Sequence, residues 1–166
     1  MNAGLFDLTG KNALVTGGAQ GLGRMIAEGL LRAGATVAIT SRKADICEAA
    51  AYEMAALGKC IALPADLSTP EAAVDLAQRY RETVGGTLHV LVNNAGKTWG
   101  GTVDTFPDKA WPGVMMVNVQ TPFTLVRELL PELTAAGTPD DPARVINIGS
   151  IAGATTAKLS AYSYSA

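Results

Sequence analysis

Glycine recurs at positions 17, 21 and 23 of the segment Thr16–Gly23, which reads Thr-Gly-Gly-Ala-Gln-Gly-Leu-Gly. Because glycine has no Cβ, it permits tight turns and lets a ligand approach the main chain closely. The apolar run Asn12–Val15 precedes the segment and a helix-like stretch follows it, and the amide groups at a helix start attract negative charge. The segment therefore predicts a site for the diphosphate of a nucleotide, with an ordinary glycine turn as the alternative. The residues expected to bind there are Gly17, Gly21, Leu22 and Gly23.

A second polar group follows the apolar run Thr36–Thr40 and consists of Ser41, Arg42 and Lys43. Nucleotide-binding turns that select NAD place an acidic residue here for the ribose hydroxyls, and this sequence has none. A hydroxyl beside two cations favours the 2′-phosphate of NADP. We therefore expect Ser41 and Arg42 to bind that phosphate and NAD to be the less favoured cofactor. A solvated basic turn is the alternative.

Two more polar groups follow later apolar runs. Asp66 and Leu67 come after the third run, where a carboxylate can accept a hydrogen bond from the adenine amino group; helix capping is the alternative role. The small, amide-rich stretch Asn93–Gly96 comes after the fourth run and is suited to hold neighbouring strand ends while leaving room for a cofactor. A plain turn is its alternative. Cofactor contacts are expected at Asp66, Leu67, Asn93, Ala95 and Gly96.

These groups need a scaffold that brings the ends of several strands to one edge. The expected strands are Asn12–Thr16, Thr36–Thr40, Cys60–Pro64, Leu88–Val92 and Arg144–Ile148. The expected helices are Gly21–Ala33, Ala44–Leu57, Pro70–Val84, a stretch near Phe106–Val117 and one from about Thr121 to Ala136, with Ser68 or Thr69 capping the third. Alternation of apolar strands and helices predicts a parallel sheet covered on both faces. The chain is thus expected to form a single α/β domain over residues 1–166, a Rossmann-type doubly wound parallel sheet with ligands at the carboxyl ends of its strands.

Composition limits the possible partners. The chain has 166 residues, 48% of them hydrophobic and 17% charged, with a formal net charge of −2. There is no basic excess for nucleic acid, no apolar run of membrane-spanning length and no signal-peptide pattern at the start. Cys47 and Cys60 have no metal-ligand spacing and are interpreted as reduced, structural thiols. We expect a cytoplasmic protein that binds no metal, nucleic acid or membrane.

The motifs together resemble the short-chain dehydrogenase/reductase family over essentially the whole chain. The matching residues are the glycines of Thr16–Gly23, Asp66, Asn93–Gly96, Asn118, Ser150 and a tyrosine near the end. The resemblance implies reversible hydride transfer between a nicotinamide cofactor and a carbonyl or alcohol, in a homo-oligomer; Ser41 and Arg42 favour NADP(H) as that cofactor. Its overall sequence pattern is most similar to that of the reductases that act on 3-oxoacyl thioesters of acyl carrier protein. Sugar-acid and polyol dehydrogenases of the same family are the alternative.

The resemblance also implies that Asn118, Ser150 and Tyr164 are catalytic. In the family a serine after the fifth strand polarises the substrate oxygen, and a tyrosine followed four residues later by lysine donates the proton. Counted from Tyr162 the lysine position is Ala166, and counted from Tyr164 it falls two residues beyond the sequence. Tyr164 is therefore predicted to be the proton donor and Tyr162 a packing or cleft residue. The chain is expected to be incomplete at its C-terminus; a non-catalytic nucleotide-binding or partner-docking module is the alternative.

Three more expectations concern the region between the fourth and fifth strands. A helix continuing through Pro122 would leave the Asn118 carbonyl without its usual amide donor, free to hold a water in a proton relay; a helix break there is the alternative. Trp99 is expected to border the substrate cleft. Trp111 is expected to pack in the core.

Overall fold

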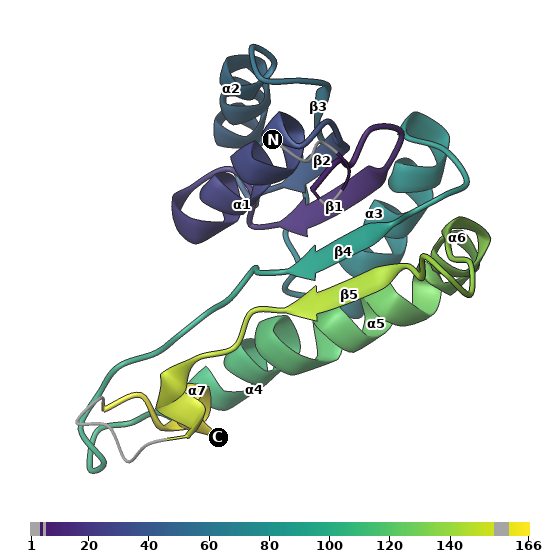
Figure 1. The fold of residues 1–166 in the computed structure, drawn as a ribbon. Coiled ribbons are helices and arrows are strands. Elements are labelled where there is room, and N and C mark those ends of the chain that lie inside the picture. The colour runs from purple at the N-terminus through teal and green to yellow at the C-terminus, as the bar shows by residue number, and fades with distance from the viewer. Residues whose placement is uncertain (1–3, 5, 155–159) are drawn as a thin grey trace.

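Five parallel strands form one sheet in the computed structural model, which describes residue 4 and residues 6–154 and 160–166 (Figure 1). The strand order is β3-β2-β1-β4-β5, so the chain reverses its direction of sheet growth after β3 and adds β4 on the other side of β1. The strands are β1 (Asn12–Thr16), β2 (Thr36–Thr40), β3 (Cys60–Ala62), β4 (Val90–Asn93) and β5 (Arg144–Asn147). This is the predicted doubly wound Rossmann-type arrangement, and the point of reversal lies between β1 and β4.

Helices cover both faces of this sheet. They are α1 (Gly21–Arg32), α2 (Ala44–Met54), α3 (Pro70–Thr83), α4 (Ala110–Met115), the π-helix η1 (Met116–Gln120), α5 (Thr121–Glu128), α6 (Leu130–Ala136), the 3₁₀ turn η2 (Ile151–Gly153) and α7 (Tyr162–Ser165). Successive side chains of a strand point to opposite faces. In β1, Ala13 and Val15 therefore pack in one core cluster with α1 and α2, whereas Leu14 packs in another with α3 and α5.

Proline and threonine decide several helix boundaries. Thr69 caps α3, because its hydroxyl accepts a hydrogen bond from the Ala72 amide at 3.2 Å. The single helix predicted from Thr121 to Ala136 is wrong: it divides at Leu129, between α5 and α6. Pro131 explains the division, since it has no amide hydrogen to donate to a carbonyl of the preceding turn.

The helical backbone from α4 to α5 is continuous through a π turn. The amide of Thr121 donates to the carbonyl of Met116, five residues earlier, and both residues have right-handed helical backbone angles. The predicted alternative of a helix break before Pro122 is therefore wrong. The predicted start near Phe106 is also too early, because α4 begins at Ala110.

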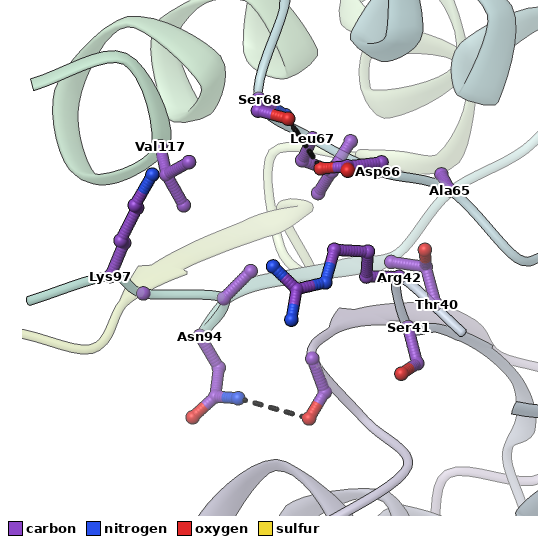
Figure 2. Close-up of a pocket in the computed structure, with 13 residues that line it drawn as sticks. Thr40, Ser41, Arg42, Ala65, Asp66, Leu67, Ser68, Asn94, Lys97 and Val117 are labelled. Atoms are coloured by element: carbon purple, nitrogen blue, oxygen red, sulfur yellow. Dashed lines mark hydrogen bonds between the residues drawn. The ribbon is translucent and has the colours of Figure 1, made fainter. Parts of the chain in front are cut away.

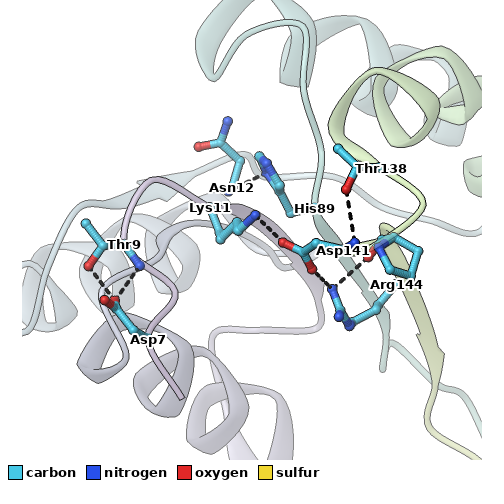
Figure 3. Close-up of polar contacts among 9 residues, drawn as sticks. Asp7, Thr9, Lys11, Asn12, His89, Thr138, Asp141 and Arg144 are labelled. Atoms are coloured by element: carbon cyan, nitrogen blue, oxygen red, sulfur yellow. Dashed lines mark hydrogen bonds and ion pairs between the residues drawn. The ribbon is translucent and has the colours of Figure 1, made fainter. Parts of the chain in front are cut away.

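A polar network ties the amino ends of three strands together (Figure 3). Asp141 accepts from Lys11 at 2.6 Å and from Arg144 at 2.8 Å, which joins the start of β1 to the start of β5. His89, just before β4, accepts the Asn12 amide proton at Nδ1 over 3.0 Å. This network lies at the opposite end of the sheet from the predicted ligand site.

Every residue of the edge strand β5 is exposed to solvent. In the same part of the chain, no helix combines the length and the apolar character that crossing a membrane requires.

Candidate functional site

A cavity of about 530 Å³ opens at the carboxyl ends of the strands, beside the point where the strand order reverses (Figure 2). Its walls come from all four predicted groups, which follow β1, β2, β3 and β4. Among the predicted cofactor residues it is lined by Gly17, Ser41, Arg42, Asp66, Leu67, Ala95 and Gly96. The fold therefore brings together positions up to 79 residues apart, as between Gly17 and Gly96.

The glycine segment is shaped by a close crossing of the main chain. Gly17 and Gly21 have φ angles of +65° and +53°, which other residues rarely adopt. A Cβ at Gly23 would lie 2.2 Å from the Gly17 carbonyl oxygen and 2.4 Å from Nδ2 of Asn94. Of this segment only Gly17 lines the 530 Å³ cavity. Gly23 is buried and allows the close approach of α1, and Leu22 is 53% exposed and faces a second cavity.

The stretch Asn93–Gly96 holds neighbouring strand ends, as predicted. The Thr16 hydroxyl accepts from the amides of Asn94 and Ala95, both at 2.9 Å, and Asn94 Nδ2 donates to the Thr16 carbonyl at 2.9 Å. Asn93 Nδ2 donates to Asn147 Oδ1 at 2.8 Å, which links β4 to β5. The end of β4 is thus fixed to strands on both sides.

The charged groups of the 530 Å³ cavity suit an anionic ligand. Figure 2 shows Arg42 extending across the cavity from the end of β2, while Lys97 lies on the opposite side beside Val117. The single carboxylate in the lining, Asp66, accepts from the amide and the hydroxyl of Ser68. Asp66 thus forms a turn with Ser68 and lies in the cavity wall, whereas the cap of α3, the alternative predicted for Asp66, is Thr69. Lys97 was not among the site residues predicted from the sequence; its position directly after Gly96 was the available signal.

Thr40 provides a second sign that this cavity is built for a ligand. Its side chain is 1% exposed, and Oγ1 has no hydrogen-bond partner among the described residues. A buried hydroxyl without a partner is costly. A polar ligand in the cavity would supply one.

A second cavity, of about 760 Å³, brings the three predicted catalytic residues together. Asn118 of η1, Ser150 before η2 and Tyr164 of α7 all line it, together with Leu22 and Asn93. The Ser150 oxygen accepts from the Ala152 amide at 3.2 Å, which leaves its hydroxyl proton free to donate to a ligand. Asn94, Ala95 and Gly96 line both cavities, so the two adjoin.

The Asn118 side chain is fixed to the main chain after β4. Its Oδ1 accepts from the Lys97 amide at 2.8 Å, and its Nδ2 donates to the Lys97 carbonyl at 2.9 Å. This pair of bonds joins η1 to the segment that forms the wall between the two cavities.

The aromatic side chains of Tyr162, Trp111 and Trp99 have different surroundings. Tyr162 does not line either cavity and packs edge-on against Phe106, with ring centroids 5.1 Å apart, so it is a packing residue. The predicted core position of Trp111 is wrong, because this side chain is 37% exposed and packs against Phe106 only at its edge. Trp99 is 40% exposed and lines neither cavity.

The cysteines carry no metal site in the described residues. Cys47 is buried and Cys60 half-buried, and both are free thiols. Burial raises the pKa of both, that of Cys60 to about 11, so these side chains remain protonated thiols at neutral pH.

A parallel sheet with a glycine turn after β1 and a cavity at its point of reversal defines the Rossmann-type class of α/β proteins. Within that class, the sequence model of the short chain dehydrogenase family matches residues 11–166. The chain belongs to this family.

Several relatives are known by activity or structure. A rhamnolipid-biosynthesis 3-oxoacyl-[acyl-carrier-protein] reductase of Pseudomonas aeruginosa is 46% identical over 96% of this chain. The structure of the Pseudomonas aeruginosa RhlG/NADP active-site complex matches with a TM-score of 0.93 over 96% of this chain, at 46% identity. This chain spans 62% of the length of both. A 5-keto-D-gluconate 5-reductase of Escherichia coli K12 is 38% identical over 75% of this chain, which spans 48% of that enzyme.

Proposed function

We propose that the protein is an NADP(H)-dependent oxidoreductase that reduces a ketone to a secondary alcohol, with a 3-oxoacyl thioester as the favoured substrate. The observation that carries the proposal is the adjoining pair of cavities: one has a glycine turn and Arg42, and the other gathers Asn118, Ser150 and Tyr164. The Pseudomonas aeruginosa reductase and the NADP complex described above support the cofactor and the substrate class.

The residues of the 530 Å³ cavity fit NADP(H). Gly17 leaves main chain without a Cβ at the cavity wall for a diphosphate, Ser41 and Arg42 offer a hydroxyl and a cation for the 2′-phosphate, and the Thr40 hydroxyl lacks a partner among the described residues. Asp66 and Leu67 would bind the adenine, and the stretch Asn93–Gly96 would border the rest of the cofactor. When bound, the reduced cofactor supplies a hydride.

The residues of the 760 Å³ cavity would handle the proton and the substrate oxygen. Ser150 would donate its free hydroxyl proton in a hydrogen bond to that oxygen and stabilise the charge that develops on it. Tyr164 would donate a proton to the same oxygen. A free tyrosine has a pKa of about 10, so proton exchange at neutral pH needs a nearby cation. In the family pattern this cation is the ammonium group of a lysine, which stands four residues after the tyrosine that matches Tyr164.

Asn118 would act through its main chain. Because Pro122 has no amide hydrogen, the Asn118 carbonyl lacks the donor that an α-helix would supply at that position. The continuous helical backbone there agrees with this hypothesis. We propose that this carbonyl holds a relay water between solvent and the lysine–tyrosine pair, while the Asn118 side chain fixes the backbone of Lys97.

Two other functions are separable by experiment. A sugar-acid dehydrogenase is the nearest alternative, supported by the 38% identity to the Escherichia coli 5-keto-gluconate reductase. A nucleotide-binding or partner-docking module without turnover is the alternative of a different class.

We further propose that the protein is cytoplasmic and homo-oligomeric. Two partly exposed apolar side chains of α4 that line neither cavity, Trp111 and Met115, support association.

The test uses the full-length natural protein. NADPH and NADH are titrated by fluorescence, and turnover is measured with a 3-oxoacyl thioester and with 5-keto-gluconate. Arg42→Met is expected to weaken NADPH binding by roughly 10–100-fold, since hydrogen bonds to charged groups are worth about 1.5–3 kcal/mol, and to leave NADH binding nearly unchanged. Tyr164→Phe is expected to lower kcat by roughly 10²–10⁴-fold with NADPH binding intact. Equal affinity for both nucleotides in the wild type, or undiminished turnover by Tyr164→Phe, would refute the corresponding assignment.

A further inference from the structure

An aromatic cluster of Phe106, Trp111 and Tyr162 links three parts of the chain outside both cavities. Phe106 precedes α4, Trp111 belongs to α4 and Tyr162 begins α7. The rings of Phe106 and Tyr162 lie 5.1 Å apart at 84°, and those of Phe106 and Trp111 lie 6.1 Å apart at 70°. Both pairs have the edge-to-face geometry that aromatic rings prefer.

Phe106 is itself held in place by a closed turn. The Thr105 amide donates to the Thr102 carbonyl at 3.1 Å, and the two threonine hydroxyls lie 2.8 Å apart. At the start of the same loop, the Gly101 amide donates to the Ser160 carbonyl at 2.8 Å. The loop thus contacts the chain at Ser160, two residues before α7, and at Tyr162, the first residue of α7.

The start of α7 is held by such tertiary contacts. Its first residue, Tyr162, follows Ala161, whose backbone angles are not helical. Ser163 is 2% exposed and Ala161 is 8% exposed, so this part of the helix is well packed. The contact of the Tyr162 ring with Phe106 is one of the contacts that orient it.

Because Tyr162 and Tyr164 lie on the same helix, the contact of the Tyr162 ring with Phe106 also fixes the direction in which Tyr164 points. Residues two apart in an α-helix point about 200° away from each other. With the Tyr162 ring against Phe106, Tyr164 consequently points to the other side of α7, where it lines the cavity with Ser150 and Asn118.

We propose that Phe106 is a positioning residue for Tyr164 and acts through the Tyr162 ring. The proposal rests on the proposed function, in which Tyr164 is the proton donor. Because Phe106 lines neither cavity, its loss should disturb proton transfer and leave nucleotide binding intact.

The kinetic test uses the full-length protein with NADPH and its best ketone substrate. Phe106→Ala is expected to lower kcat by about tenfold or more, since a misplacement of ~1 Å can cost about 10²-fold, with the Kd for NADPH changed by less than about twofold. Phe106→Leu, which keeps apolar bulk and folds more safely, should show a smaller loss of the same kind, and Phe106→Tyr should restore kcat. Tyr162→Ala should resemble Phe106→Ala, and the double variant should be no worse than either because the two act as a unit. The control, Tyr52→Ala, removes an 85% exposed ring on α2 and should change nothing.

Amide hydrogen exchange supplies a readout that needs no turnover. The peptide covering residues 160–166 should lose protection in Phe106→Ala and Phe106→Leu, while peptides from α1 keep theirs. An unchanged kcat, an equal loss of NADPH affinity, additive effects in the double variant or unchanged exchange would each overturn the proposal. If the wild type reduces no ketone, the proposed function fails, and the exchange measurement still decides whether Phe106 orients α7.

Discussion

Two glycines on the same helix are predicted to respond in opposite ways to the same substitution. Gly23 and Gly29 both lie on α1. A Cβ at Gly23 would stand 2.2 Å from the Gly17 carbonyl oxygen, a contact with main chain that no side-chain rotation can relieve. A Cβ at the exposed Gly29 would meet nothing within 4 Å. Gly23→Ala should therefore displace the nucleotide turn, and Gly29→Ala should simply strengthen the helix.

The two effects can be estimated separately. Alanine in place of glycine inside a helix gains about 0.5–1 kcal/mol, which is the full expected gain in the free energy of unfolding for Gly29→Ala. Gly23→Ala has the same helix gain, but overpacking costs about 1–3 kcal/mol, and contact with a carbonyl favours the upper end of that range. The net loss for Gly23→Ala is then about 2 kcal/mol, and the two variants should differ by about 3 kcal/mol.

Urea unfolding followed by circular dichroism measures this difference, and fluorescence titration measures NADPH binding to each variant. Gly29→Ala should bind NADPH like the wild type, whereas Gly23→Ala should bind it at least about tenfold more weakly, because the displaced turn loses contacts with the nucleotide and each 1.4 kcal/mol of lost contact is tenfold in affinity. If Gly23→Ala unfolded at the same urea concentration as Gly29→Ala and bound NADPH normally, the close crossing of α1 and the turn would not be essential, and the reasoning would be wrong.

Two further predictions concern the network at the amino ends of the strands. Burial and the nearby Lys11 ammonium lower the pKa of His89, against a smaller opposite effect of Asp141, and its Nδ1 accepts the Asn12 amide proton only when that nitrogen is unprotonated. The unfolded state therefore binds the proton more readily, so the free energy of unfolding should fall as the pH drops below about 6.5, and His89→Gln should abolish this slope in urea titrations at several pH values. Asp141 has a pKa lowered to about 2 by hydrogen bonds from Lys11 and Arg144, so its contribution to stability is present above its ordinary pKa and is lost as the pH falls through about 2. Asp141→Asn should accordingly lower the thermal unfolding midpoint at pH 7 and lower it much less near pH 2, where the carboxyl is half protonated in the folded state; a shift of equal size at both values would contradict the ion-pair explanation.

The order of strands and helices was predictable because its signals are local. An apolar run followed by the glycines of Thr16–Gly23 predicts β1, its turn and α1, and Thr69 with Pro70 marks the start of α3. A helix prediction was wrong where the sequence pattern was continuous but the helical backbone was interrupted. The apolar stretch between Thr121 and Ala136 gave no sign of the division at Leu129 except Pro131, whose missing amide hydrogen breaks the helix.

The candidate site was predictable in its residues but not in its connections. Polar residues at strand ends can be read one by one, because parallel strands deliver their carboxyl ends to one edge. The sequence could not show that the Thr16 hydroxyl accepts hydrogen bonds from the amides of Asn94 and Ala95, which lie 78 and 79 residues later. Nor could it show that Lys97 faces the same cavity as Arg42, since a lysine after a turn is ordinarily a surface residue.

The sequence by itself determined the class of fold and the polar positions that follow its strands, because periodicity, glycine and proline act within a few residues of themselves. The spacing of the family pattern favoured Tyr164 as the cavity residue and left two places open for Tyr162, in the packing or in the cleft; only the tertiary structure decided between those two places. Tyr162 and Tyr164 are neighbours in sequence and chemically alike, and the contact of the Tyr162 ring with Phe106, 56 residues earlier, distinguishes them. That contact exists only when α4 and α7 are packed together, so no local pattern could have encoded it.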